Sequence, residues 1–451
     1  LIAARLVQAA GGGILVPVGT AAASHLFEGH ARPRALGVIG ALTFLGMAAG
    51  PFLGAAILGG VHVDVALARA GLAAGALLDM LSPAWRWIFY INVPIGIVAL
   101  VLGWAASSGW DTPRRPGRVD VLGGAIFSLA LVGGLVGLTL LGSGAVADVG
   151  LDPGVVIAVL LALAVVATLL TIVRGFRADD PYLDPRLFRS GVFSSATLVS
   201  LLTGYGFATA IIGGAVFVDR VLYGGPGVQR VALGSLAAAT AVGALASGFL
   251  VRVLSLRLVT IIGLVASAVA LLLMSRWTAD TGVGAVASTL ALFGLGFGLT
   301  VTPRSTAAVE AVGRRSFGIA SATVTLARMV GMAVGLAILT AYGSTTIEHL
   351  YDRVHASDDA YKQFIPLELR DRPLRDGLVV EALENWAAGE GAGILSGVFL
   401  AAAAVTVVAI PAALVLRGRP RMLAEVPALA GVLIPAVEAD GPDDVEPNLA
   451  L

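Results

Sequence analysis

Long apolar segments follow one another along almost the whole chain, separated by short polar stretches. Each is close to the length of about 20 residues that an α-helix needs to cross the hydrocarbon core of a bilayer. Gly and Ala are frequent inside these segments, as is usual where membrane helices pack closely. The pattern predicts eleven membrane-spanning helices, over residues 1–24, 35–58, 85–107, 119–141, 154–173, 192–218, 228–251, 258–274, 283–302, 317–342 and 392–416.

Three regions fall outside these spans. Residues 65–81 are apolar but contain Arg69 and Asp79, which favours a surface or re-entrant segment. Residues 343–391 are long and mixed in charge, and we expect a loop with short surface helices at 361–364 and 378–386. Residues 417–451 end in an acidic, Pro-bearing sequence, which is typical of a disordered tail.

The composition supports a membrane protein. Of 451 residues, 57% are hydrophobic and 13% are charged, whereas soluble domains carry about 25% charged residues. Basic and acidic residues number 29 each, so the net charge gives no reason to expect a nucleic-acid partner. The absence of Cys excludes disulfides, thiolate metal sites and thiol catalysis. No nucleotide-binding or hydrolase motif is found, so we expect no enzyme activity and no cofactor or metal.

The basic residues alternate between successive loops and predict the orientation. One set of loops carries only Arg69, Arg220, Arg230 and Arg276. By the positive-inside rule the other set is cytoplasmic, which places the C-terminus in the cytoplasm and residues 343–391 outside. The cytoplasmic set comprises Arg32, Arg34, Arg114, Arg115, Arg118, Arg174, Arg177, Arg186, Arg189, Arg252, Arg257, Arg304, Arg314, Arg315, Arg417, Arg419 and Arg421.

The second span contains Gly46, Gly50, Pro51 and Gly54. Glycines at four-residue spacing leave one helix face free of side chains, which lets a neighbouring helix approach closely. Pro51 removes a backbone donor in the middle of the span and bends the helix there. Two interpretations are open: the motif serves only for tight packing between helices, or it also acts as a hinge.

Two arginines lie within predicted spans, where a charge costs about 2.5–3.5 kcal/mol on insertion scales. Arg5 is near the outer end of the first span, with Gln8 one turn further on the same face, and it either snorkels or lies in a polar cavity. Arg328 is near the middle of the tenth span, and is either functional or paired with a carbonyl or an acid. No Asp or Glu lies deep inside any span; the nearest, Asp219, adjoins Arg220 and is expected to form an interface pair.

The third span begins with an aromatic belt and an anchoring arginine, followed by a flexible Pro-Gly point. Its sequence is W-R-W-I-F-Y-I-N-V-P-I-G, with Trp85, Arg86, Trp87, Asn92, Pro94 and Gly96 as its distinctive residues. This string, the R-L-V-Q that starts at Arg5 and the G-M-A-A-G-P-F-L-G that starts at Gly46 resemble three motifs of the major facilitator superfamily. Within it, they are most similar to the fourteen-helix drug:proton antiporters. Ala9 and Ala55 stand where those motifs have Gly.

The resemblance implies an all-α membrane protein with two six-helix bundles and two extra helices, here without the first three helices. Residues 1–107 would be the remainder of the N-terminal bundle, family helices 4–6. Residues 108–190 would be the two linker helices, 191–416 the C-terminal bundle and 417–451 a cytoplasmic tail. It also implies that Arg5, Gln8 and Arg328 take part in proton coupling and that Gly46, Gly50, Pro51 and Gly54 form an antiporter hinge.

The function that the resemblance implies is proton-coupled export of amphiphilic drugs or other small molecules across the cytoplasmic membrane by alternating access. The partners would be the lipid bilayer, a small-molecule substrate, protons and an accessory protein of the cell envelope. Tyr205, Phe207, Phe293 and Phe297 are candidate cavity aromatics, although ordinary packing explains each of them equally well. The alternatives are an exporter of a lipid or siderophore-type metabolite, and a non-transporting membrane fragment or sensor.

Overall fold

The structure is a computed structural model that describes residues 2–27, 31–60, 80–81, 83–107, 120–143, 152–179, 181–312, 316–355, 360–373 and 375–416. All regular elements in these ranges are helical. Most of the predicted re-entrant segment at 65–81 and the whole predicted tail at 417–451 lie outside the described residues.

The prediction of an all-α membrane protein is confirmed. Ten helices of the described chain are long and apolar enough to cross a bilayer, and α2, with 30 residues, corresponds to the remaining predicted span. The third predicted span is divided at Ile91 into two helices. The membrane-length elements are α1 (Ile2–Leu26), α2 (Ala31–Gly60), α5 (Ala84–Tyr90) with α6 (Asn92–Ala106), α7 (Val121–Ser143), α8 (Pro153–Arg177), α9 (Gly191–Arg220), α10 (Pro226–Leu250), α11 (Leu256–Met274), α12 (Val283–Glu310), α13 (Phe317–His355) and α14 (Gly377–Leu414).

Helices α9 to α14 pack into a bundle that contains the largest part of the buried core. Glycines bring their backbones into direct contact: a Cβ added at Gly331 of α13 would overlap the carbonyl oxygen of Leu201 on α9. Buried hydroxyls also join helices, since Ser247 Oγ on α10 donates to Thr302 Oγ1 on α12 at 2.7 Å. Close backbone approach and interhelical hydrogen bonds are the usual stabilising contacts between membrane helices.

Helix α2 packs against α10 and α12, and α1 packs against α13. A Cβ at Gly37 would lie 3.1 Å from the Ala244 carbonyl oxygen of α10. No described atom lies within 4 Å of a Cβ at Gly46 or Gly50. The close neighbour expected at the Gly46–Gly54 motif is therefore found in the first half of α2 instead, because that half is the part that meets α10. The helix continues through Pro51.

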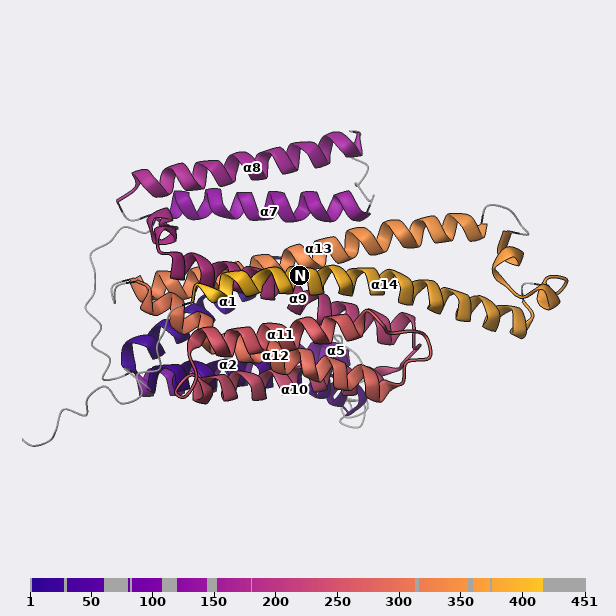
Figure 1. Cartoon of the computed structure of the whole chain (residues 1–451), viewed down its shortest axis with the longest axis horizontal. Coiled ribbons are helices and arrows are strands. Elements are labelled where there is room, and N and C mark those ends of the chain that lie inside the picture. Colours follow the sequence, from indigo (N-terminus) through magenta and orange to yellow (C-terminus); the bar gives the residue numbers. More distant parts are fainter. Residues whose placement is uncertain are drawn as a thin grey trace, which may run out of the picture.

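Helices α7 and α8 form an antiparallel pair at one edge of the molecule, with α7 facing α13 (Figure 1). Small residues again set their spacing, since a Cβ at Gly137 of α7 would lie 2.9 Å from Leu161 Cδ2 of α8. A short 3₁₀ helix, η1 (Pro185–Arg189), follows α8 and leads to α9. This pair occupies the stretch where the resemblance places the linker helices.

Helices α13 and α14 have 39 and 38 residues and project well past their neighbours (Figure 1). They occupy much of the stretch 343–391 that was expected to be a loop. The short helix expected at 361–364 is confirmed as η3 (Ala360–Phe364), whereas 378–386 is the first part of α14. Asp376 explains the early start, because its Oδ1 accepts a hydrogen bond from the Leu378 N–H at 3.0 Å and caps the helix. A second short helix, η4 (Leu367–Leu369), lies between them.

Candidate functional site

A cavity of about 500 Å³, its mouth included, lies where α1 and α2 face α9, α12 and α13. Helix α2 contributes most of the apolar wall, and α12 and α13 contribute the charged groups. The lining residues are Val16, Thr20, Leu36, Ile39, Gly40, Thr43, Phe44, Ser200, Val301, Arg304, Ser305, Val324, Thr325 and Arg328.

Arg304 is a charged residue almost completely buried in this wall, with 1% of its surface exposed. Its Nη1 donates to Thr203 Oγ1 of α9 at 2.5 Å and to Thr300 Oγ1 at 3.5 Å. Its Cζ lies 5.2 Å from the centroid of the Phe297 ring, within the range of a cation–π contact. All of these partners are neutral, so they hold the guanidinium in place without balancing its charge.

The sequence-based placement of Arg304 in a cytoplasmic loop was wrong. Helix α12 continues through Pro303 to Glu310, so Arg304 is an internal residue of the helix. Proline is tolerated in a membrane helix where neighbouring groups satisfy the backbone acceptor that it leaves free. The missed signal is the sequence after Arg304, since residues 306–309 are small or apolar and all are buried.

Arg328 lies on α13, half-buried, and lines the same cavity. Within the described part of the chain its side chain has no hydrogen-bond or ion-pair partner. No carboxylate is found among the described residues that line the cavity. Two guanidinium groups therefore line one cavity, and like charges that are close together repel each other. The role of Arg328 in proton coupling stays a prediction.

Gln8 is exposed on α1, eight residues before Val16, the first cavity residue of this helix, which is about 12 Å along the helix. The structure therefore does not bring Gln8 to the cavity. The structure describes the backbone but not the side-chain surroundings of three further candidates, Arg5, Pro51 and Gly54. Gly46 and Gly50 are exposed and do not line the cavity.

The aromatic string at the start of the third span ties α5 to the residues before it. Trp87 Nε1 donates to the Leu81 carbonyl at 2.9 Å, and the Tyr90 hydroxyl donates to the Met80 carbonyl at 3.0 Å. Arg86 Nη1 donates to the same Met80 carbonyl at 3.3 Å. These contacts fit an anchoring segment. The backbone of Trp85 lies in α5, and Asn92, Pro94 and Gly96 are exposed on α6.

The four candidate cavity aromatics lie in the buried core of the bundle and not on the cavity surface. The rings of Phe207 and Phe297 stack at 4.4 Å, and Tyr205 and Phe293 belong to the same core cluster. The cavity aromatic is Phe44 of α2, whose ring lies 5.6 Å from that of Phe297. Periodicity indicates that Gly40, Thr43 and Phe44 share a helix face, but it does not say which helix they meet.

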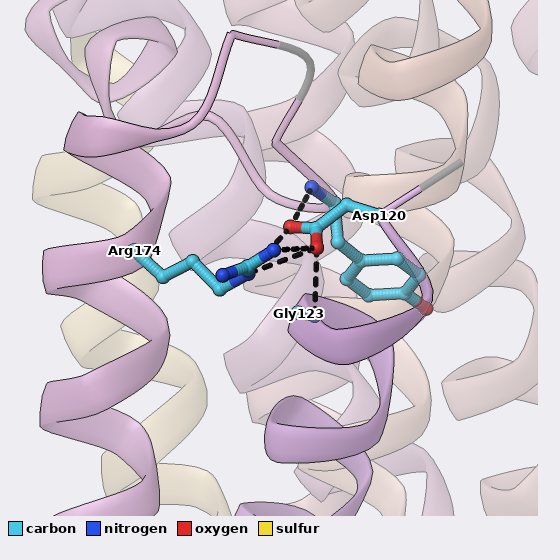
Figure 2. Close-up of polar contacts among 4 residues, drawn as sticks. Asp120, Gly123 and Arg174 are labelled. Atoms are coloured by element: carbon cyan, nitrogen blue, oxygen red, sulfur yellow. Dashed lines mark hydrogen bonds and ion pairs between the residues drawn. The ribbon is translucent and has the colours of Figure 1, made fainter. Parts of the chain in front are cut away.

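A separate ion pair joins the two helices of the α7–α8 pair at their ends (Figure 2). Arg174 Nη2 lies 2.7 Å from Asp120 Oδ1, and the N–H groups of Gly123 and Tyr182 donate to the same carboxylate at 2.8 and 3.3 Å. The hydrogen bond from Arg174 and those from the backbone hold the pKa of Asp120 at about 2. Because this pair is remote from the cavity residues in the fold, we interpret it as structural.

The expected ion pair of Asp219 and Arg220 is formed, and its place at the membrane interface stays a prediction. Arg220 Nε lies 3.2 Å from Asp219 Oδ2, and both side chains are exposed at the end of α9. Such an exposed pair contributes little to stability.

Comparison with known proteins adds to this geometry. A family model described as Major Facilitator Superfamily matches residues 1–336. A protein of Mycolicibacterium hassiacum, named a triacylglyceride transporter, is 32% identical over 356 residues, covering 76% of this chain and 61% of the relative. A Mycolicibacterium smegmatis protein of the same name is 30% identical over 356 residues, covering 76% of this chain and 59% of its own length. A triacylglyceride transporter of Mycobacterium tuberculosis is 30% identical over 357 residues, covering 76% of this chain and 64% of the relative. The chain thus spans about three fifths of the length of these relatives.

Proposed function

Because the chain belongs to the major facilitator superfamily, whose members are membrane transporters and not enzymes, we propose that it acts in the export of lipid-like amphiphiles across the cytoplasmic membrane. The names of the similar proteins support a lipid substrate over the drug expected first from the sequence. In this proposal the C-terminus is cytoplasmic, and the projecting part of α13 and α14 lies outside, as the arginine distribution predicts.

The observation that carries the proposal is the projection of α14. Ser396 Oγ donates to the carbonyl of Ser275, the residue directly after α11, at 2.6 Å. The Tyr223 hydroxyl, just after α9, donates to the Glu384 carbonyl at 3.3 Å, and Ala388, Ala392 and Leu395 are buried in the bundle core. Only residues 377–383 of α14 therefore extend past both α9 and α11, and at 1.5 Å per residue they measure about 10 Å.

The projection offers a surface that a water-insoluble substrate needs. Moving apolar surface into water costs about 25 cal/mol per Å², so a lipid leaves a membrane readily only along another apolar surface. Leu378 and Val380 are exposed on the projecting part of α14. Near them, Tyr361, Ile365 and Val379 form a small core of their own that stabilises the tip. A soluble drug would need no such extension.

The position of the cavity supports alternating access. Its walls come from α1 and α2 on one side and from α9, α12 and α13 on the other. In transporters of this kind, substrate sites lie between two halves that rock against each other. The direct backbone contact of Gly331 with Leu201 would move α9 and α13 as one body.

The test compares two probes in vesicles that contain the full-length protein with an imposed pH gradient. One probe is a fluorescent triacylglycerol and the other is ethidium, a cationic drug. A second protein has residues 348–383 replaced by a short Gly-Ser turn, and its membrane level and melting temperature are measured first. We expect the complete protein to transfer the lipid and the shortened protein to transfer it about tenfold more slowly, a difference of about 1.4 kcal/mol in barrier.

Proton-coupled drug export is the second candidate, and the resemblance of the Trp85–Gly96 string to drug:proton antiporters favours it. It predicts that both proteins move ethidium at the same rate against the gradient and that neither transfers the lipid. That result would overturn lipid export. Lipid transfer that collapses the pH gradient would join proton coupling to the lipid proposal.

A further inference from the structure

The cavity carries an imbalance of charge that the protein itself does not correct within the described residues. Arg304 and Arg328 both line it, and no Asp or Glu does. The next acid along α12, Glu310, is six residues beyond Arg304 and is exposed at the helix end. By sequence, no acid lies deep in any other span.

Two uncompensated cations in a membrane protein are costly. A charge in the middle of a span is unfavourable unless it pairs or faces water, and repulsion between two guanidinium groups adds to that cost. Arg304 Nη1 is bonded to two threonine hydroxyls, whereas Nε and Nη2 have no acceptor among the described residues. An arginine has five N–H donors in a fork that suits carboxylate and phosphate oxygens.

We propose that this cavity binds the anionic head group, a phosphate or a carboxylate, of an amphiphilic ligand through Arg304 and Arg328. The inference rests on the proposed export function and names the chemistry of its substrate. Thr325 supplies a further hydroxyl on the same wall, whereas the Ser305 hydroxyl donates to the Val301 carbonyl of its own helix at 2.9 Å. Leu36 and Phe44 of α2 form the apolar wall opposite, where the first part of the ligand's chain would pack.

The orientation of the two walls suits such a ligand. The cations are on α12 and α13, in one half, and the apolar wall is on α2, in the other. A head group held by the arginines would therefore place its chain across the boundary between the halves. A neutral lipid supplies no counter-charge to the two guanidinium groups, so in this proposal the cavity selects an anionic amphiphile, whereas transfer of triacylglycerol tests the apolar projection alone.

Binding is measured by titration calorimetry on the full-length protein in a nonionic detergent at constant ionic strength. Decyl phosphate, decanoate and decanol share one chain and differ in the head group, and inorganic phosphate has no chain. We expect the better of the two anions to bind at least about tenfold more tightly than decanol and than inorganic phosphate. Equal binding of decanol would exclude recognition of charge, and equal binding of inorganic phosphate would exclude an amphiphile.

Arg304→Gln and Arg328→Gln should each weaken binding of that anion about tenfold, and Arg304→Lys should weaken it less than Arg304→Gln because the charge is kept. Arg276→Gln removes an equal charge from an exposed position away from the cavity and should leave binding unchanged. Equal loss in the Arg276 variant would reduce the effect to net charge and would overturn the site.

The unliganded variants give an independent readout. If a ligand supplies the counter-charge, then Arg328→Gln should melt no lower than the wild type without ligand, because Arg328 has no hydrogen-bond or ion-pair partner among the described residues, whereas Arg304 also holds Thr203 of α9. If a carboxylate of the full-length protein pairs with either arginine, its removal should lower the melting temperature strongly, since the acid is left buried and unpaired. That second result would overturn the proposal.

The two proposals fail in different ways. Transfer of the fluorescent triacylglycerol without binding of either anion would leave lipid export standing and remove the anionic head group. Tight binding of the anion with no lipid transfer in vesicles would support an anion site in this cavity and would contradict the proposed export function.

Discussion

The bundle α9–α14 and the helices α1, α2 and α6 are all apolar and all contain glycine, but they are held in different ways. In the bundle, Gly331 lies against the Leu201 carbonyl, and 17 residues of α9 are buried. Gly50 of α2 has no described atom near its Cβ position, and α6 has no buried residue among those described. A glycine therefore contributes to packing only where a neighbouring backbone reaches it, whatever motif surrounds it.

Two hydroxyl groups also differ between the bundle and α2 in whether their hydrogen bond joins two helices. In the bundle, Ser200 Oγ of α9 donates to the Val324 carbonyl of α13 at 2.8 Å, which joins two helices. In α2, Thr43 Oγ1 donates to the Ile39 carbonyl of its own helix at 2.8 Å. The first bond resists separation of helices, whereas the second satisfies a polar group without linking anything.

The largest difference in stability between the bundle and α2 should appear when a leucine side chain is added at Gly331 or at Gly50. Gly331→Leu should destabilise the protein by about 3 kcal/mol or more, because overpacking forces α9 and α13 apart. Gly50→Leu should change stability by no more than about 0.5 kcal/mol in this conformation. Thermal unfolding of both purified variants in detergent measures the difference. Equal destabilisation would show that the second half of α2 is packed as closely as the bundle.

A smaller effect should come from the ion pair that joins α7 to α8. The pKa of Asp120 is lowered from 3.8 to about 2 in the folded protein, so its carboxylate stabilises the fold above pH 4 and this contribution is lost as pH falls towards 2. Asp120→Asn should therefore lower the melting temperature by a constant amount above about pH 4, and the difference from wild type should shrink below it.

Asp219→Asn is the matched control, because it breaks an ion pair whose side chains are both exposed. It should leave the melting temperature almost unchanged at every pH. A difference between wild type and Asp120→Asn that stays the same down to pH 2.5 would show that the carboxylate charge is not what holds the α7–α8 pair.

The smallest effect should come from the two hydroxyls. Ser200→Ala removes the bond from α9 to α13 and should cost about 0.6 kcal/mol, the average for such bonds between membrane helices. Thr43→Val keeps the shape of its side chain and removes only a bond within α2, so stability should change by less than about 0.3 kcal/mol. Unfolding in a denaturing detergent has the resolution for this pair. A larger loss of stability for Thr43→Val than for Ser200→Ala would contradict the difference between α2 and the bundle.

The sequence by itself determined the order and class of the membrane helices that the structure describes. A run of apolar residues long enough to cross a bilayer is a local property, and it forms a helix whatever its neighbours are, because backbone groups in lipid must be satisfied within the helix. The ion pair of Asp219 and Arg220 could be predicted for the same reason, since its two residues are adjacent.

Only the tertiary structure decided which face of each helix meets a neighbour. It placed Arg304 inside α12 and beside Arg328, although the sequence around Pro303 was read as the end of a span. It also put Phe44 on the cavity wall and Phe207 and Phe297 behind it. The 3.6-residue period indicates which residues share a face, but the partner of that face is set by contacts between distant segments, which no local pattern contains.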